Sequence, residues 1–85
     1  MVQRWFRARG LPALGAAVKG ARESAGLSQS SLAELIGSSR PTLSRLERGI
    51  PVTTDALTKA LTSAGYEIYV VPRTAQVRIE FDDAG

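Results

Sequence analysis

Glycines placed at intervals through the middle of the chain limit what it can fold into. Gly26, Gly37, Gly49 and Gly65 each follow a stretch of helical pattern, and glycine readily adopts the left-handed backbone that ends a helix. This spacing predicts four short helices and excludes one long rod. Because the whole chain has 85 residues, the helices must pack into one small domain, which we expect to span residues 11–65.

Apolar residues recur at helical spacing in each of these four segments. The side chains expected to face the core are Leu14, Val18, Ala21 and Ala25, then Leu32, Leu35 and Ile36, then Leu43 and Leu46, and finally Leu57, Ala60, Leu61 and Ala64. Hydroxyl residues precede the last three segments, and a hydroxyl oxygen can accept a hydrogen bond from a free amide of the first turn. The expected caps are Ser28, Ser38 or Ser39, and Thr53 or Thr54.

β-branched and aromatic side chains dominate the chain after Gly65. Residues 66–71 are predicted to form a strand, and residues 77–81 alternate apolar and charged side chains as a second strand would. A lone strand has unpaired edges and little stability of its own. We therefore expect residues 66–81 to make the dimer, or the two runs to form an intrachain hairpin instead. The dimerisation residues expected are Tyr66, Ile68, Tyr69, Val70 and Val71.

The two ends of the chain lack any regular pattern. Residues 1–10 are predicted to form a basic arm that carries Trp5 and Phe6 among three arginines, and residues 82–85 an acidic tail. Three interpretations of the arm stay open. The arm is either loosely packed, or it follows DNA, or it serves as an apolar anchor for a protein partner.

Composition excludes several classes of function. The chain has no cysteine and no histidine, so it has no disulfide and none of the usual zinc or haem ligands, and we expect no cofactor. No serine has an evident base, which argues against an enzyme. The apolar run at residues 68–71 is far shorter than the ~18 residues that a membrane span needs. We expect a cytoplasmic protein with no membrane partner.

Charge is divided unevenly along the chain. Residues 1–48 hold eight basic and three acidic side chains, whereas residues 49–85 hold three basic and five acidic ones. This division favours a polyanion as the partner of the first half.

Residues 28–49 carry the motif that points to function. They combine a short helix, a tight turn at Gly37 and a second short helix, which is the order of a helix-turn-helix, whose second helix enters the DNA major groove. The outward face of that second helix is polar and basic, away from Leu43 and Leu46. Its residues are Ser39, Arg40, Ser44 and Arg45. Arginine is the commonest reader of guanine, so the motif predicts a double-stranded DNA partner.

At this point the chain resembles a known family, the XRE (Cro/C-repressor) helix-turn-helix proteins, in the stretch LSQSSLAELIGSSRPTLSRLERG at residues 27–49. The resemblance implies a mainly α, lambda-repressor-like domain of four to five helices and an operator as its DNA. It implies that Gln29 contacts a phosphate and braces the recognition helix, and that Arg22 and Glu47 form an ion pair. Pro41 departs from the polar base contact that the family often has at its position, so we expect apolar readout there, for example of a thymine methyl. The DNA-contacting set is then Ser28, Gln29, Ser39, Arg40, Pro41, Ser44, Arg45 and Arg48.

A strand placed directly after the helices makes the chain resemble HipB-type antitoxins within that family. That likeness implies a homodimeric repressor that neutralises a kinase-like toxin and represses its own operon. The competing interpretation is a protein–protein adaptor whose helix-turn-helix binds DNA weakly or not at all.

Overall fold

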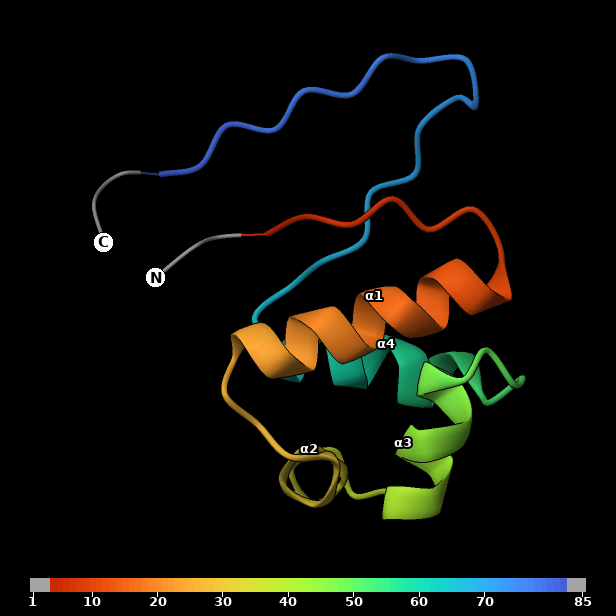
Figure 1. The fold of residues 1–85 in the computed structure, drawn as a ribbon, viewed down its shortest axis with the longest axis vertical. Helices are drawn as coiled ribbons and strands as arrows, with labels where there is room; N and C mark the ends of the chain where they lie inside the picture. Colours follow the sequence, from red (N-terminus) through yellow and green to blue (C-terminus); the bar gives the residue numbers. More distant parts are fainter. Residues whose placement is uncertain (1–3, 83–85) are drawn as a thin grey trace.

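The computed structural model describes residues 4–82 and holds four helices in that range: α1 (Leu11–Ser24), α2 (Gln29–Leu35), α3 (Arg40–Glu47) and α4 (Thr54–Ser63) (Figure 1). α1 packs against α3 and α4, and α2 packs against the same two helices. Residues 1–3 of the predicted arm and 83–85 of the predicted acidic tail lie outside the described residues. Within residues 4–82, every helix is too short or too polar to cross a membrane.

Local chemistry places the helix ends where the sequence predicted them. The side-chain oxygens of Ser28, Ser39 and Thr53 each accept a hydrogen bond from the amide three residues further on, at 3.0, 3.3 and 3.1 Å. Each of these bonds satisfies an amide that has no partner within its own helix. Ser39 and Thr53 are therefore the caps, rather than their neighbours Ser38 and Thr54.

The core lies between the four helices and consists of small and medium-sized apolar side chains. Its buried members are Val18, Ala21, Leu32, Ala33, Leu43, Leu46, Ala60, Leu61 and Ala64. Leu32 and Leu43 are fully buried, so α2 and α3 are each fixed to the core by a leucine. Most of the side chains predicted to face inward do so.

Two predicted core residues point to solvent instead. Leu35 is 62% exposed, because Leu32, Ala33 and Ile36 occupy the inner face of this short helix and Leu35 lies about 100° round the axis from Ile36. Ala25 is exposed because it caps the end of α1 rather than continuing its apolar face.

A glycine in α1 sets how closely α3 approaches. A Cβ atom on Gly15 would lie 2.5 Å from the carbonyl oxygen of Leu46 and 2.8 Å from that of Glu47. Gly49, with φ of +79°, likewise lies against the backbone of Pro12. The C-terminal end of α3 therefore rests directly on the backbone of α1.

The C-terminal strands predicted from the sequence are absent from residues 4–82. Residues 66–71 and 77–81 are extended but form no ladder, and a turn closed by the Ala75 amide and the Pro72 carbonyl at 2.9 Å separates them. Figure 1 shows the two extended segments diverging from that turn instead of pairing as a hairpin. A strand needs a neighbour for its backbone hydrogen bonds, and no other segment within residues 4–82 gives residues 67–71 a backbone hydrogen bond.

Candidate nucleic-acid interface

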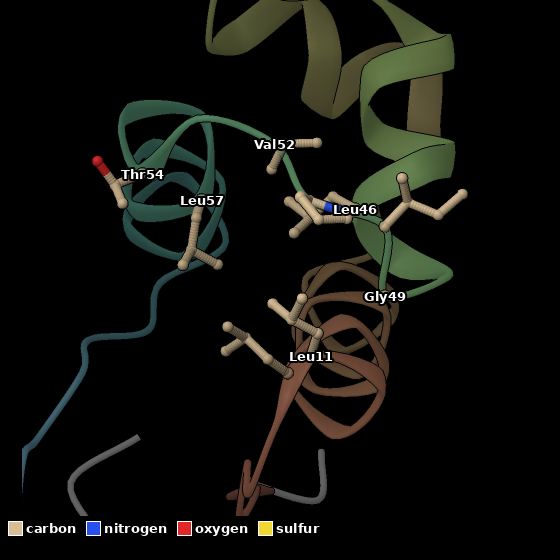
Figure 2. A pocket seen from close by; sticks show the side chains of 9 residues that line it. Leu11, Leu46, Gly49, Val52, Thr54 and Leu57 are labelled. Carbon is tan, nitrogen blue, oxygen red and sulfur yellow. The ribbon is translucent and has the colours of Figure 1, made fainter.

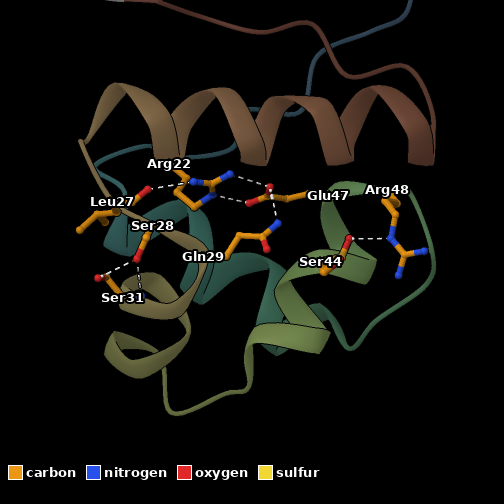
Figure 3. A network of polar contacts seen from close by, with 8 residues as sticks. All are labelled: Arg22, Leu27, Ser28, Gln29, Ser31, Ser44, Glu47 and Arg48. Atoms are coloured by element: carbon orange, nitrogen blue, oxygen red, sulfur yellow. Dashed lines mark hydrogen bonds and ion pairs between the residues drawn. The ribbon is translucent and has the colours of Figure 1, made fainter.

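A polar network behind α3 ties it to α1 and α2 (Figure 3). The Arg22 Nε atom donates to Glu47 Oε2 at 2.6 Å and the Nη2 atom to Oε1 at 2.9 Å. Gln29 on α2 donates from Nε2 to the same Oε1 atom at 3.1 Å. The pair that the resemblance implied is thus formed, and Gln29 braces α3 through Glu47.

The ion pair at the centre of this network is largely buried. The side chains of Arg22 and Glu47 are only 11% and 4% exposed, and Arg22 also donates from Nη1 to the Leu27 carbonyl at 2.9 Å. Hydrogen bonding to Glu47 raises the pKa of Arg22 above its usual value, although burial opposes the shift. The guanidinium therefore stays charged at neutral pH, and α3 keeps its place on α1 and α2.

Gln29 can serve the network and DNA together. A side-chain amide has two N–H donors, and one is directed at Glu47. The second can donate to a phosphate at the start of α2, where Gln29 is half-buried.

The outward face of α3 carries the predicted contact residues. Arg40, Pro41 and Arg45 are exposed, whereas Leu43 and Leu46 on the opposite side are 0% and 4% exposed. The leucines anchor the helix and leave the arginines in solvent. This arrangement fits a recognition helix.

The other predicted contact residues are partly engaged in local bonds. Ser28 and Ser39 are exposed but act as helix caps, and Ser44 is half-buried. Arg48 is exposed, and its Nε atom donates to the Ser44 carbonyl at 3.2 Å (Figure 3). These bonds hold the ends of α2 and α3. Arg48 uses one N–H group in its bond to Ser44, and its guanidinium has further N–H donors.

Sequence reasoning did not include Thr42 among the contact residues. Its hydroxyl lies 3.0 Å from that of Ser39, and the residue is half-buried three positions before Arg45. Residues three apart on a helix neighbour each other, so Thr42 lies beside Arg45.

An apolar pocket lies away from this face, between α1, the loop after α3, and α4 (Figure 2). Its volume is about 140 Å³, and Leu11, Leu46 and Leu57 reach into it from three helices. The rest of the lining is Leu14, Gly49, Ile50, Pro51, Val52 and Thr54. None of these described residues is ionisable, and residues 4–82 hold no cluster of three or more metal-ligating side chains. The pocket offers packing but no acid or base.

A helix-turn-helix family profile matches residues 18–65, which is more than half of the chain. The chain belongs to the helix-turn-helix family of the XRE type. Members of the XRE type are DNA-binding transcription regulators. In a helix-turn-helix the second helix is the one that enters the major groove.

Two crystal structures of the clp gene regulator ClgR from Corynebacterium glutamicum are similar to this XRE-type chain. One has 33% sequence identity and a TM-score of 0.63, over 72% of this chain and 67% of that chain. The other has 32% identity and a TM-score of 0.63, over 73% of this chain and 85% of that chain. Comparison with curated proteins gives no match.

Proposed function

We propose that this XRE-type protein is a dimeric, sequence-specific transcription repressor that inserts α3 into the major groove of its operator. One observation carries the proposal. α3 exposes Arg40 and Arg45 while Leu43 and Leu46 bury its opposite side. The family membership and the likeness to ClgR support the regulatory role.

The contact residues divide by chemistry. Arg40, Ser44 and Arg45 read base edges, because a guanidinium can form a two-pronged bond to guanine, and the apolar ring of Pro41 meets a thymine methyl. Phosphate contacts set the register of the protein on the duplex without reading sequence. Ser28, Gln29, Ser39 and Arg48, at the ends of α2 and α3, supply them.

Dimerisation rests on the C-terminal segment, residues 66–82. Ile68, Tyr69, Val70 and Val71 are between 49% and 93% exposed, and Ile79 and Phe81 add to the exposed apolar surface. Among the described residues, no backbone hydrogen bond joins residues 67–71 to a neighbouring segment. Antiparallel pairing with a second copy gives the shared edge of each strand its backbone hydrogen bonds and covers part of this apolar surface. A two-fold axis can then place two recognition helices ~34 Å apart, which is one turn of DNA.

Sedimentation of the full chain tests the dimer. Val70 is 93% exposed, so Val70→Lys leaves the fold of the single chain intact but places a charge in the proposed pairing. We expect the wild type to sediment as a dimer and Val70→Lys as a monomer with weak operator binding. The matched control is Leu35→Lys, which changes an exposed leucine outside the segment and should stay dimeric. A dimeric Val70→Lys protein overturns the pairing.

Salt dependence tests DNA binding against the adaptor alternative. Neutralising Z phosphates makes log K fall against log[salt] with a slope of about −0.9Z. We expect a steep slope and a preference for one selected sequence over random duplex. A shallow slope without sequence preference favours the adaptor. The HipB-type antitoxin role stays a prediction of the resemblance alone.

A further inference from the structure

The N-terminal arm is seated on the helical domain by one side chain. A Cβ atom on Gly20 of α1 would overlap the ring of Phe6, so the ring occupies a notch that only glycine leaves open. The same ring lies 5.8 Å from that of Tyr66, centroid to centroid, and the Arg4 guanidinium sits 4.8 Å from its centroid. Phe6 and Tyr66 both pack on the core. The arm and the base of the C-terminal segment therefore share one anchor.

This anchor places the arm far from the recognition helix. Figure 1 shows the arm running along one side of α1, while α2 and the N-terminal end of α3 lie on the other side. An arm that follows the DNA held by α3 would have to leave the Gly20 notch. The structure thus favours an anchored arm over both a loose arm and a DNA-following arm.

Charge then distinguishes the arm from the segment beside it. Residues 1–10 hold three arginines and no acid, and Arg7 and Arg9 are exposed. Residues 66–85 hold four acidic and two basic side chains. Their acids Glu67 and Glu80 bond only to exposed neighbours, Tyr69 at 2.7 Å and Arg78 at 3.7 Å. Exposed contacts of this kind contribute little and exchange easily for a better partner.

We infer that the basic arm belongs to the self-association surface, where Arg7 and Arg9 of one copy meet the acidic C-terminal segment of a second copy. A two-fold interface contains every contact twice, so the arm of each copy contacts the C-terminal segment of the other copy. Phe6 holds the arm on the side where residue 66 begins that segment. This inference rests on the proposed dimer and assigns the arm to it rather than to DNA.

Releasing the arm without unfolding the domain is the first test. Gly20→Ala adds a methyl group that displaces the Phe6 ring, and alanine favours the helix more than glycine does. We expect circular dichroism to show a folded α-helical protein and the dimer dissociation constant to rise about three- to tenfold, the range of a lost aromatic contact. Phe6→Ala should raise the dimer dissociation constant by the same factor as Gly20→Ala. The double variant, Phe6→Ala with Gly20→Ala, should weaken the dimer no further than either single variant. Lys19→Ala, an exposed neighbour on α1, is the control and should change nothing.

Charge exchange is the second test. Arg7→Glu with Arg9→Glu gives an acidic arm, and Glu67→Arg with Glu80→Arg gives a basic segment. Each variant alone should dimerise more weakly than wild type, and an equimolar mixture should form the mixed dimer in preference to either homodimer.

Three outcomes overturn the inference. Gly20→Ala could dimerise like wild type, or the charge variants could mix statistically. The acidic-arm variant could instead keep its dimer but lose about two units of DNA salt slope, which would place the arm on phosphates. None of these results touches the proposed dimer, which fails separately if Val70→Lys remains dimeric.

Discussion

Arg22 and Glu47 stand 25 residues apart in the sequence, yet two hydrogen bonds join them, from Nε to Oε2 at 2.6 Å and from Nη2 to Oε1 at 2.9 Å. Both side chains are nearly buried. The pair connects α1 to the recognition helix, and Gln29 adds α2 to the connection. The orientation of α3 therefore depends on charges that solvent barely reaches.

Removing one partner of this pair should be costly. Glu47→Ala leaves the Arg22 guanidinium buried without its carboxylate, and such a change destabilises by about 3–5 kcal/mol. Chemical denaturation measures the loss of unfolding free energy. The control is Lys59→Gln, which breaks the exposed Lys59–Asp55 pair and should cost less than about 0.5 kcal/mol. Equal losses in the two variants would show that burial does not strengthen the Arg22–Glu47 pair.

Replacing both partners separates stability from geometry. Arg22→Met with Glu47→Leu removes both charges, and apolar replacements of a buried pair are often near neutral in stability. We expect most of the unfolding free energy to return. The double variant should still bind the operator more weakly than wild type, because Gln29 no longer has the Glu47 carboxylate to hold it in place. Full recovery of DNA binding would argue against the bracing role.

Arg45 should read a base. Arg45→Ala should cost about 1–3 kcal/mol of operator binding and relax the preference at one base step. Lys59→Ala removes one positive charge from the exposed side of α4, and it should leave that preference unchanged. Binding titrations against a set of single-base operator variants measure the effect. Equal weakening on every sequence would reassign Arg45 to a phosphate.

Gly15 should not tolerate a methyl group, although it stands within a helix. Gly15→Ala places Cβ against the backbone carbonyls of Leu46 and Glu47, which cannot rotate away. Overpacking of this kind costs about 1–3 kcal/mol, more than the helix propensity that alanine gains. Thermal unfolding should show a lower midpoint for Gly15→Ala. A midpoint at or above that of wild type would contradict the close crossing of α1 and α3.

The leucines of α2 and α3 should differ sharply in their effect on stability. Leu43 is 0% exposed, and Leu43→Ala should cost about 2–5 kcal/mol because it leaves a cavity. Leu35 is 62% exposed, and Leu35→Ala should cost less than about 1 kcal/mol. Denaturant unfolding of the two variants measures the difference. A large loss at Leu35 would restore the inward orientation that the helical spacing predicted.

Features that depend on neighbours in the chain could be predicted from the sequence. The four helices, the cap at Ser28 and the glycines that end the helices follow from hydrogen bonds spanning three or four residues. For the other two caps the sequence left Ser38 or Ser39, and Thr53 or Thr54, and the structure has Ser39 and Thr53. The outward position of Arg45 follows from the same periodicity, because Arg45 lies about 160° round the helix axis from the buried Leu43. Arg40 is exposed at the first position of α3.

Other features required the packed structure, since they depend on contacts between residues far apart in the chain. Periodicity could not show that Leu35 would point to solvent, nor that Gly20 would receive Phe6. It also predicted strands where residues 4–82 of a single chain form none. A strand pattern describes side chains, whereas a strand exists only when another backbone lies beside it. Local hydrogen bonding and helical period thus determined the elements, and tertiary contacts decided which glycine makes room, which leucine is buried and which segment still lacks a partner.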